Sequence, residues 1–468
     1  MKACFLTNSE ILAAVKKADP AKGKNVRNDI GLSQLFADIF ARCCRFNTTA
    51  RQWYRYDGMR WALDECGVFA LKCMRQLARA LFIYAADQDE AYQKFVAGVQ
   101  KKQARKTIVE DAQTLMHFSS ADLDKDRALV NFQNGTLNVD TMEFREHDPD
   151  DLLSRVTNGR YDPEAKSPLW ESFLAEIMLD DAEKTRFLQQ LCGYALKGLC
   201  CEDIFVILYG PSTRNGKSTL MGSVLWAMGD YGQSINPDIL AQRQRNGEGP
   251  NGSIADLRGA LLGVAEEPSK QMTLDAALIK SMTGGSIIRA RYLNENFFEF
   301  RPRFTLFLCC NNLPQVTDAS LFESNRIRVI PFLRHFEDDE QDKTLRDTLR
   351  TDEVQAAILA WMVEGLEDYN KNGLIVPENV KDACDNYKNS GDKLGDFIQD
   401  ALEEDPRGVL SASSVYGLYQ SWCAAAGFFM DSKREFFEAL KRRNLFYDHG
   451  TVEGRTLKNV VKGYRFPD

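Results

Sequence analysis

Apolar residues follow two different spacings along the chain, and the spacing changes near residue 200. Up to about residue 127 they recur at helical intervals, as in VFALKCMRQLARALFIYAA, which predicts a mainly helical N-terminal domain over 1–127. Residues 128–195 combine a predicted hairpin, which turns at Asn134-Gly135, with further helices. We expect this second region to form a collar or linker.

Residues 196–335 have the pattern of a parallel sheet. The apolar runs IFVILYG, ALLGVAEEP and FTLFLCCNNLP are separated by helical segments, and each run ends in polar residues. Buried parallel strands have this composition, and they carry their sites at their carboxyl ends. The predicted fold class is therefore α/β, with a parallel sheet flanked by helices. A helical lid or linker is expected over 336–390, and a small domain of helices and short strands over 391–468.

Composition and charge exclude several classes of protein. The formal net charge of −8 argues against a chain coated with positive charge, but it leaves room for local basic patches such as Lys433–Arg465. That segment has nine lysines and arginines against four acids. No apolar run reaches the ~18 residues of a membrane span. The twelve cysteines form no CxxC pair and the four histidines are scattered, so we expect neither a zinc site nor disulfides, and a cytoplasmic location.

A candidate phosphate loop lies in FVILYGPSTRNGKSTLM. The phosphate-loop pattern is G-x-x-x-x-G-K-[ST], and Gly216-Lys217-Ser218 fits it, but Pro211 stands at the position of the first glycine. The nearest glycine is Gly210, so the loop holds five intervening residues where the pattern has four. Lys217 can reach terminal phosphates, Ser218 can bind Mg²⁺, and the helix amino terminus favours anions. The alternative is a glycine-rich turn that happens to precede Lys-Ser. The predicted nucleotide contacts are Gly210, Asn215, Gly216, Lys217, Ser218 and Thr219.

Two more strands end in polar pairs. Glu266 and Glu267 follow an apolar run 49 residues after Lys217, and two carboxylates there can divide the tasks of binding Mg²⁺ and activating water. We assign the metal to Glu266, together with Ser218. Asn311 follows the next apolar run, where a neutral amide can hold the water or sense a phosphate. The alternatives are a solvated acidic turn and an Asx turn.

Basic residues suggest two further roles. Arg326 and Arg328, in ESNRIRVIPF, could stabilise a transferring phosphoryl group from a neighbouring subunit, or they could be ordinary surface arginines. Lys280, Arg289 and Arg291 lie in a predicted hairpin that turns at LNEN and could hold nucleic-acid phosphates. A plain edge hairpin with solvated charges is the alternative.

Taken together, the motifs resemble those of the superfamily three helicases, specifically the C-terminal part of phage and plasmid primase–helicases. The stretches that carry the resemblance span roughly residues 50 to 335 and occur in the order of that family: NGTLNVDTMEFREHDPDD, FLQQLCGYALKG, YGPSTRNGKSTL, KSMTGGSIIRARYL, CNNLP and RIRVIPF. Two features depart from the family: the five-residue loop, and Asn325 where a second basic residue commonly precedes Arg326. A primase module is not expected, because no carboxylate pair lies on an apolar strand before the loop.

The resemblance implies an AAA+-type core that assembles as a hexameric ring and binds ATP and Mg²⁺ between subunits. In that scheme Lys217 and Ser218 form the loop pair, Glu266 and Glu267 the acidic pair, and Asn311 the polar sensor. Arg326 is the implied finger, with Arg328 as its alternative. The resemblance further implies a central-channel hairpin over residues 280–300 and a winged-helix-like, DNA-binding C-terminal domain.

The expected function is an ATP-dependent DNA helicase or translocase in the replication of a phage or another mobile element. Single-stranded or forked DNA would be its substrate, and a separate primase or polymerase is a candidate partner. Two alternatives stay open: an AAA+ ATPase that remodels or loads a replication protein, and an initiator whose tail recognises an origin.

Overall fold

In the computed structural model the chain divides into two compact units. One comprises Met1–Pro314 and Ser324–Val380, and the other Gln315–Glu323 and Lys381–Asp468. Among the described residues, no helix combines the length and apolar character that a membrane span requires. The described residues are 6–22, 27–242, 252–269, 272–293, 296–390, 393–426, 431, 433–452 and 455–467.

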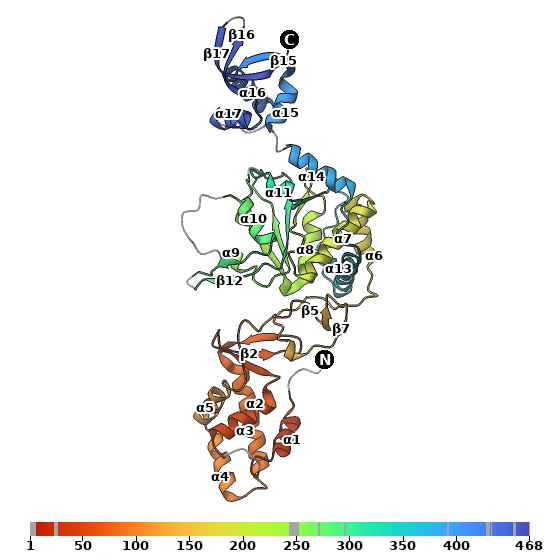
Figure 1. Cartoon of the computed structure of the whole chain (residues 1–468). Coiled ribbons are helices and arrows are strands. Elements are labelled where there is room, and N and C mark those ends of the chain that lie inside the picture. The colour runs from red at the N-terminus through yellow and green to blue at the C-terminus, as the bar shows by residue number, and fades with distance from the viewer. Residues whose placement is uncertain are drawn as a thin grey trace. The chain divides into compact units, whose positions relative to one another are not determined.

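The N-terminal part of the first unit packs five helices against a small sheet (Figure 1). Its helices are α1 (Asn8–Ala18), α2 (Asp29–Phe40), α3 (Val68–Ala85), α4 (Glu90–Val99) and α5 (Lys102–Ala112). The sheet has the order β3-β2-β1-β4, built from β1 (Cys44–Asn47), β2 (Gln52–Tyr56), β3 (Trp61–Asp64) and β4 (His117–Phe118). Buried apolar residues from all five helices form one continuous core, as the helical spacing predicts.

A three-stranded sheet follows, with β5 (Leu129–Phe132), β6 (Gly135–Asn138) and β7 (Phe144–Arg145) in sequence order. The predicted hairpin exists, but its turn is displaced by one residue. Phe132 pairs with Gly135, so the turn residues are Gln133 and Asn134. Gly135 serves packing within the sheet: a Cβ there would lie 2.5 Å from the Arg145 carbonyl oxygen.

The central layer of the first unit is a five-stranded, wholly parallel sheet with the order β14-β8-β13-β10-β9. Strands β8, β10 and β13 are the three predicted apolar runs, and nearly all their residues are buried. All five carboxyl ends meet at one edge, where the polar residues that follow the strands converge. The strands are β8 (Phe205–Tyr209), β9 (Gly232–Ile235), β10 (Leu262–Glu266), β13 (Thr305–Cys310) and β14 (Ile327–Pro331).

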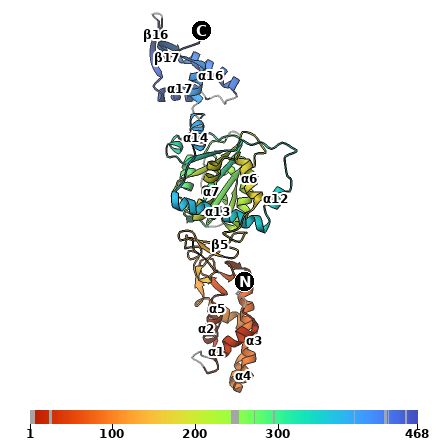
Figure 2. The ribbon, with the colours of Figure 1, turned by 90° about the vertical axis from the view of Figure 1, so that its right-hand side faces the viewer.

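Helices cover both faces of this sheet (Figure 1). One face carries α7 (Ala182–Lys197) and α8 (Lys217–Met228), with α6 (Pro168–Met178) and α13 (Asp352–Asn372) in the same layer; Figure 2 looks onto it. The other face carries α10 (Ala276–Thr283). Shorter elements of the unit are α9 (Gly252–Ala255), β11 (Ile288–Ala290), β12 (Phe298–Phe300) and α12 (Leu345–Thr348).

The second unit is built from helices and a three-stranded antiparallel sheet of order β15-β17-β16. Its core gathers apolar side chains of α15, α16, α17 and the sheet around Phe397 and Tyr419. The elements are α11 (Ser320–Glu323), α14 (Glu378–Ser390, which begins in the first unit), α15 (Lys393–Ala401), β15 (Glu403–Ser411), α16 (Ala412–Ala426), α17 (Lys433–Arg442), β16 (Phe446–Val452) and β17 (Arg455–Arg465).

Two glycines let α7 and α13 cross in backbone contact. A Cβ on Gly193 would lie 2.2 Å from the Leu366 nitrogen, and one on Gly365 would lie 2.2 Å from the Gln189 carbonyl oxygen. Because both obstacles are backbone atoms, a side chain at either position must push the helices apart. This crossing holds α13 in the layer beside α8.

We predict that Gly193→Ala lowers the free energy of unfolding by about 1–3 kcal/mol, because the added methyl overpacks the crossing. Urea unfolding followed by fluorescence measures the change. Gly98→Ala, on α4 where a Cβ would meet nothing within 4 Å, is the matched control and should leave stability unchanged or slightly higher. Equal stability of the two variants would contradict the close crossing.

Candidate functional site

The connection from β8 to α8 is shaped by backbone that few residues can adopt. Gly216 precedes α8 with φ of +84°, and Arg214 takes a left-handed φ of 58°. A Cβ on Gly210 would lie 2.1 Å from Asn215 Nδ2 and 2.9 Å from Lys217 Nζ. Glycine at 210 therefore allows the asparagine and lysine side chains to fold back over the strand end. The loop accommodates its five intervening residues with one of them, Arg214, in left-handed conformation.

The Lys217 ammonium is buried, with 5% of the residue exposed. It donates to Asn215 Oδ1 at 2.9 Å and to Asn311 Oδ1 at 2.8 Å, and Asn215 in turn donates to the Ser212 carbonyl at 2.6 Å. Within the described part of the chain, no carboxylate pairs with it. Burial lowers the pKa of Lys217, because its partners are neutral amides that do not compensate the charge. The predicted loop lysine and strand-end asparagine are thus brought into direct contact.

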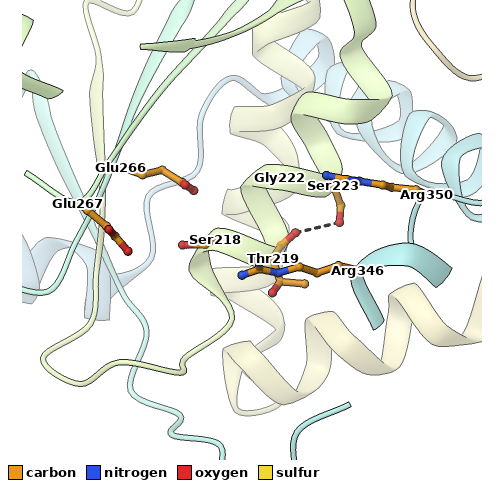
Figure 3. A pocket seen from close by; sticks show the side chains of 8 residues that line it. All are labelled: Ser218, Thr219, Gly222, Ser223, Glu266, Glu267, Arg346 and Arg350. Atoms are coloured by element: carbon orange, nitrogen blue, oxygen red, sulfur yellow. Dashed lines mark hydrogen bonds between the residues drawn. The ribbon is translucent and has the colours of Figure 1, made fainter. Parts of the chain in front are cut away.

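A cavity of about 380 Å³ lies at the amino-terminal turns of α8, where Ser218 and Thr219, the residues that follow Lys217, line it (Figure 3). Carboxylates of Glu266 and Glu267 border it on one side, and two arginines border it on the other. In Figure 3 the Ser218 hydroxyl and the Glu266 carboxylate point toward each other. The lining residues are Ser218, Thr219, Gly222, Ser223, Glu266, Glu267, Arg346 and Arg350.

The two carboxylates share this cavity because Glu267 leaves the strand conformation. Successive residues of a strand point to opposite faces, but Glu267 has a left-handed φ of 54°, and its amide donates to the Cys309 carbonyl at 3.1 Å. Burial raises the pKa of Glu266, and the neighbouring Glu267 charge raises it further. Arg346 and the Ser218 hydroxyl act in the opposite direction. In this dyad Glu266 is half-buried and Glu267 is exposed, and the Glu267 charge disfavours ionisation of Glu266.

Arg346 and Arg350 were not anticipated from the sequence. Arg346 lies on α12 and Arg350 just beyond it, and the Arg350 guanidinium stacks on Trp226 of α8 at 4.8 Å. They belong to the acidic stretch that the sequence predicts to be part of a lid or linker. In the sequence, their spacing of four residues indicates that they share one side of a helix. It does not indicate that they reach the cavity, because that depends on how this stretch folds back onto α8.

A second cavity, of about 560 Å³, adjoins the first and shares Thr219 and Arg346 with it. Its apolar walls come from α6 and from the segment after β14, and its polar walls include the loop. The apolar lining residues are Leu169, Phe173, Phe336 and Leu345; the other lining residues are Ser172, Glu176, Arg214, Gly216, Thr219, Glu340, Gln341, Asp342, Lys343 and Arg346.

The segment after β14 is tied to the loop by three contacts. Phe336 N donates to the Arg214 carbonyl at 2.9 Å, and His335 Nδ1 lies 2.9 Å from the Thr213 carbonyl oxygen. The Arg214 side chain pairs with Asp338. These contacts hold the tip of the loop and the wall of the second cavity together.

Arg326 and Arg328 lie at the other end of the sheet from the loop. Arg326 immediately precedes β14, is 8% exposed, and pairs through Nη2 with Asp203 Oδ2 at 3.1 Å. Its Nη1 donates to the Thr283 hydroxyl at the end of α10. Arg328 lies within β14, where it pairs in register with Val206 of β8. Within one chain neither arginine joins the cavity, and their role toward a neighbouring subunit remains a prediction.

Of the predicted hairpin, the structure describes the two strands but not the whole turn, since residues 294 and 295 lie outside the described residues. Strands β11 and β12 are antiparallel, with Arg289 opposite Glu299. The guanidinium groups of Arg289 and Arg291 both lie over the ring of Phe297, at 4.2 and 4.5 Å. Lys280 lies on α10, before the hairpin.

Comparisons with known proteins identify two matching family models. Residues 33–179 match the family described as D5 N terminal like, and residues 208–326 match a family of unknown function, DUF5906.

Several viral proteins are similar in sequence. "Putative helicase L207/L206" of Acanthamoeba polyphaga mimivirus is 28% identical over 64% of this chain and 33% of its own length. "Putative helicase 121R" of Invertebrate iridescent virus 3 is 27% identical over 59% of this chain and 33% of its own length. The chain thus spans about one third of these curated relatives. Among solved structures, the apo structure of the NrS-1 C terminal region has a similar fold, with a TM-score of 0.50 and 9% identity, covering 94% of this chain and 100% of that one.

We predict that Glu267→Gln moves the acid limb of Mg²⁺-dependent nucleotide binding to lower pH. The wild-type pKa of Glu266 is raised by burial and by Glu267, so the carboxylate expected to hold Mg²⁺ protonates at a higher pH than an ordinary glutamate. Removing the neighbouring charge lowers that pKa. Binding of a fluorescent ATP analogue across pH measures the limb, and exposed Glu171→Gln is the control. A limb that stays in place or moves upward would contradict the coupling.

Proposed function

We propose that the chain is a member of the primase–helicase family and an ATP-dependent DNA helicase or translocase that works as a hexameric ring. One observation carries the proposal: a buried lysine, whose partners among the described residues are amide oxygens, lies at the amino terminus of a helix and at the carboxyl edge of a parallel sheet. Such a buried cation with neutral partners favours an anionic ligand, and helix amino termini favour phosphate.

The residues present fit a nucleoside triphosphate with Mg²⁺. Gly210 leaves space for the lysine and for close approach of a phosphate to the loop backbone. The first cavity offers hydroxyl, carboxylate and guanidinium groups, and its lining begins at Ser218, the residue after Lys217. The adjoining second cavity offers the apolar and aromatic walls that a base and ribose require, and Thr219 and Arg346 line both.

In the proposed reaction Lys217 holds the terminal phosphate oxygens, and Asn215 and Asn311 keep the ammonium in place. Ser218 and Glu266 would hold Mg²⁺, which would supply positive charge that neutralises the phosphates. Glu267 orients the attacking water and accepts its proton. Arg346 and Arg350 add positive charge from the same chain, where negative charge develops.

The ring is proposed to complete the site with an arginine from the adjacent copy, Arg326 or, alternatively, Arg328. Arg326 is held on one side by Asp203 and Thr283, which fix the plane of its guanidinium. A pre-oriented guanidinium loses little side-chain entropy when it meets a phosphate. In this scheme the core is AAA+-type, and ATP lies between subunits.

DNA is proposed to contact the β11–β12 hairpin in the central channel. Arg289 and Arg291 supply positive charge for backbone phosphates, and Phe297 beneath them supplies an aromatic face. The second unit, with its helices, three-stranded sheet and basic α17, is proposed to be a winged-helix-like DNA-binding domain. The specific biological setting, replication of a phage or other mobile element, rests on the resemblance and on the viral relatives.

We predict that Lys217→Met weakens ATP binding about 100-fold, because it removes the charge-assisted hydrogen bonds to the phosphates. Equilibrium binding of a fluorescent ATP analogue provides the measurement. Lys184→Met is the matched control: Lys184 is also buried, and burial likewise lowers its pKa, but it lies on α7. Unchanged binding in Lys217→Met, or an equal loss in the control, would refute the assignment.

We predict that Arg289→Ala/Arg291→Ala raises the DNA concentration for half-maximal ATPase stimulation about tenfold, because two phosphate contacts are lost. Hydrolysis without DNA should be unchanged. Steady-state ATPase assays with single-stranded DNA measure this change. If the chain is instead a protein-remodelling ATPase, the substitution should have little effect, and a protein partner rather than DNA should stimulate hydrolysis.

A further inference from the structure

The exposed face of α3 in the N-terminal part carries only basic, neutral polar and apolar residues. Lys72, Arg75 and Arg79 are all exposed, and their spacing of three and four residues places them on one side of the helix. The opposite side, which includes Met74 and Leu77, is buried in the core. The helix itself contains no acidic residue. A row of cations therefore faces solvent on a protein whose formal net charge is −8.

Two large apolar side chains continue the same face. Phe82 is 60% exposed and lies three residues beyond Arg79, and Ile83 beside it is 48% exposed. From Lys72 to Phe82 the helix rises about 15 Å. Cations followed by an exposed aromatic ring form the combination that binds single-stranded nucleic acid, since phosphates contact the charges and a base stacks on the ring.

A second basic stretch lies next to α3. The amide of Gln100, at the end of α4, donates to the Ala78 carbonyl at 2.8 Å, which places the start of α5 against α3 beside Arg79. Exposed lysines follow at once: Lys101, Lys102 and Lys106. Residues 91–109 hold five lysines and arginines and no acid.

Two of the α3 cations and the neighbouring lysines of α5 are not compensated by ion pairs among the described residues. In the described ranges, no carboxylate pairs with Arg75, Arg79, Lys101, Lys102 or Lys106. The acids that flank α3 in the chain lie beyond its two ends: Asp64 and Glu65 before it, and Asp87, Asp89 and Glu90 after it. Asp64 accepts from the Phe69 and Ala70 amides, and Asp89 pairs with Arg27. Surface cations without a carboxylate partner, such as Arg75 and Arg79, gain most from a polyanion, because its binding releases counterions.

We propose that the exposed face of α3, formed by Lys72, Arg75, Arg79 and Phe82, binds single-stranded DNA outside the ATPase core. The phosphates lie along the three cations, and one base stacks on Phe82. The face would hold the strand as a site additional to the hairpin. The identification of the polyanion as DNA rests on the proposed function. The binding of a polyanion rests on the charge and exposure of this face alone.

The test compares full-length variants by fluorescence anisotropy with a labelled oligothymidylate at several salt concentrations. Lys72→Ala/Arg75→Ala/Arg79→Ala should weaken binding about tenfold or more and reduce the magnitude of the salt slope by about 2, at ~0.7 per lost phosphate contact. Phe82→Ala should weaken binding about tenfold through loss of stacking. Lys16→Ala/Lys17→Ala/Lys22→Ala, an equal charge change at exposed sites on and near α1, is the control and should bind within about twofold of wild type.

Two readouts keep this proposal distinct from the proposed function. Combined with Arg289→Ala/Arg291→Ala, the α3 substitutions should multiply the loss of affinity, because the two sites are separate. ATP hydrolysis at saturating DNA should stay at the wild-type level in the α3 variants. Three results would overturn the proposal: wild-type DNA affinity in the triple variant, an equal loss of affinity in the control, or a lower mass of the assembled protein with unchanged DNA affinity. The last result would assign the face to a contact with a neighbouring copy or an acidic protein.

Discussion

A buried ammonium group needs a partner, and the candidate site is organised around the one on Lys217. Its two contacts are amide oxygens, one from the loop that precedes it and one from the end of β13. Neutral partners fix the position of the charge but do not cancel it. The site consequently keeps a desolvated positive charge, which an incoming phosphate can neutralise more favourably than water-exposed lysines could.

The rest of the first unit supports this arrangement. Parallel strands bring Asn311 and the Glu266–Glu267 dyad to the same edge as the loop, although they lie far apart in sequence. The crossing of α7 and α13 through paired glycines fixes the helical layer beside α8. The segment after β14 returns to the loop tip through Phe336 and carries Arg346 into the cavity. The sheet thus brings Asn311 into contact with Lys217, and the strand ends and the returning segment place the two carboxylates and Arg346 around the cavity that begins at Ser218.

The sequence predicted those parts of the site that depend on local pattern. Apolar runs ending in polar residues identified β8, β10 and β13, and the parallel order of the strands made their ends converge. It did not reveal Arg346 and Arg350, because their position depends on how the segment after β14 folds back. It predicted that Glu266 and Glu267 act at one site, but it did not reveal how they reach one cavity, which depends on the left-handed conformation of Glu267. The turn predicted at Asn134-Gly135 was wrong by one residue, because β6 begins at the glycine. The domain boundaries, the roles of Arg326 and Arg328 and the cytoplasmic location remain predictions.

The most direct test of the central claim is ATP-dependent strand displacement on a forked DNA duplex by the purified chain. The account predicts that the labelled strand is released when ATP and Mg²⁺ are both present, and that a non-hydrolysable ATP analogue gives no release. Failure to release the strand, by a preparation that binds the fork and hydrolyses ATP, would contradict a helicase driven by the charge at Lys217.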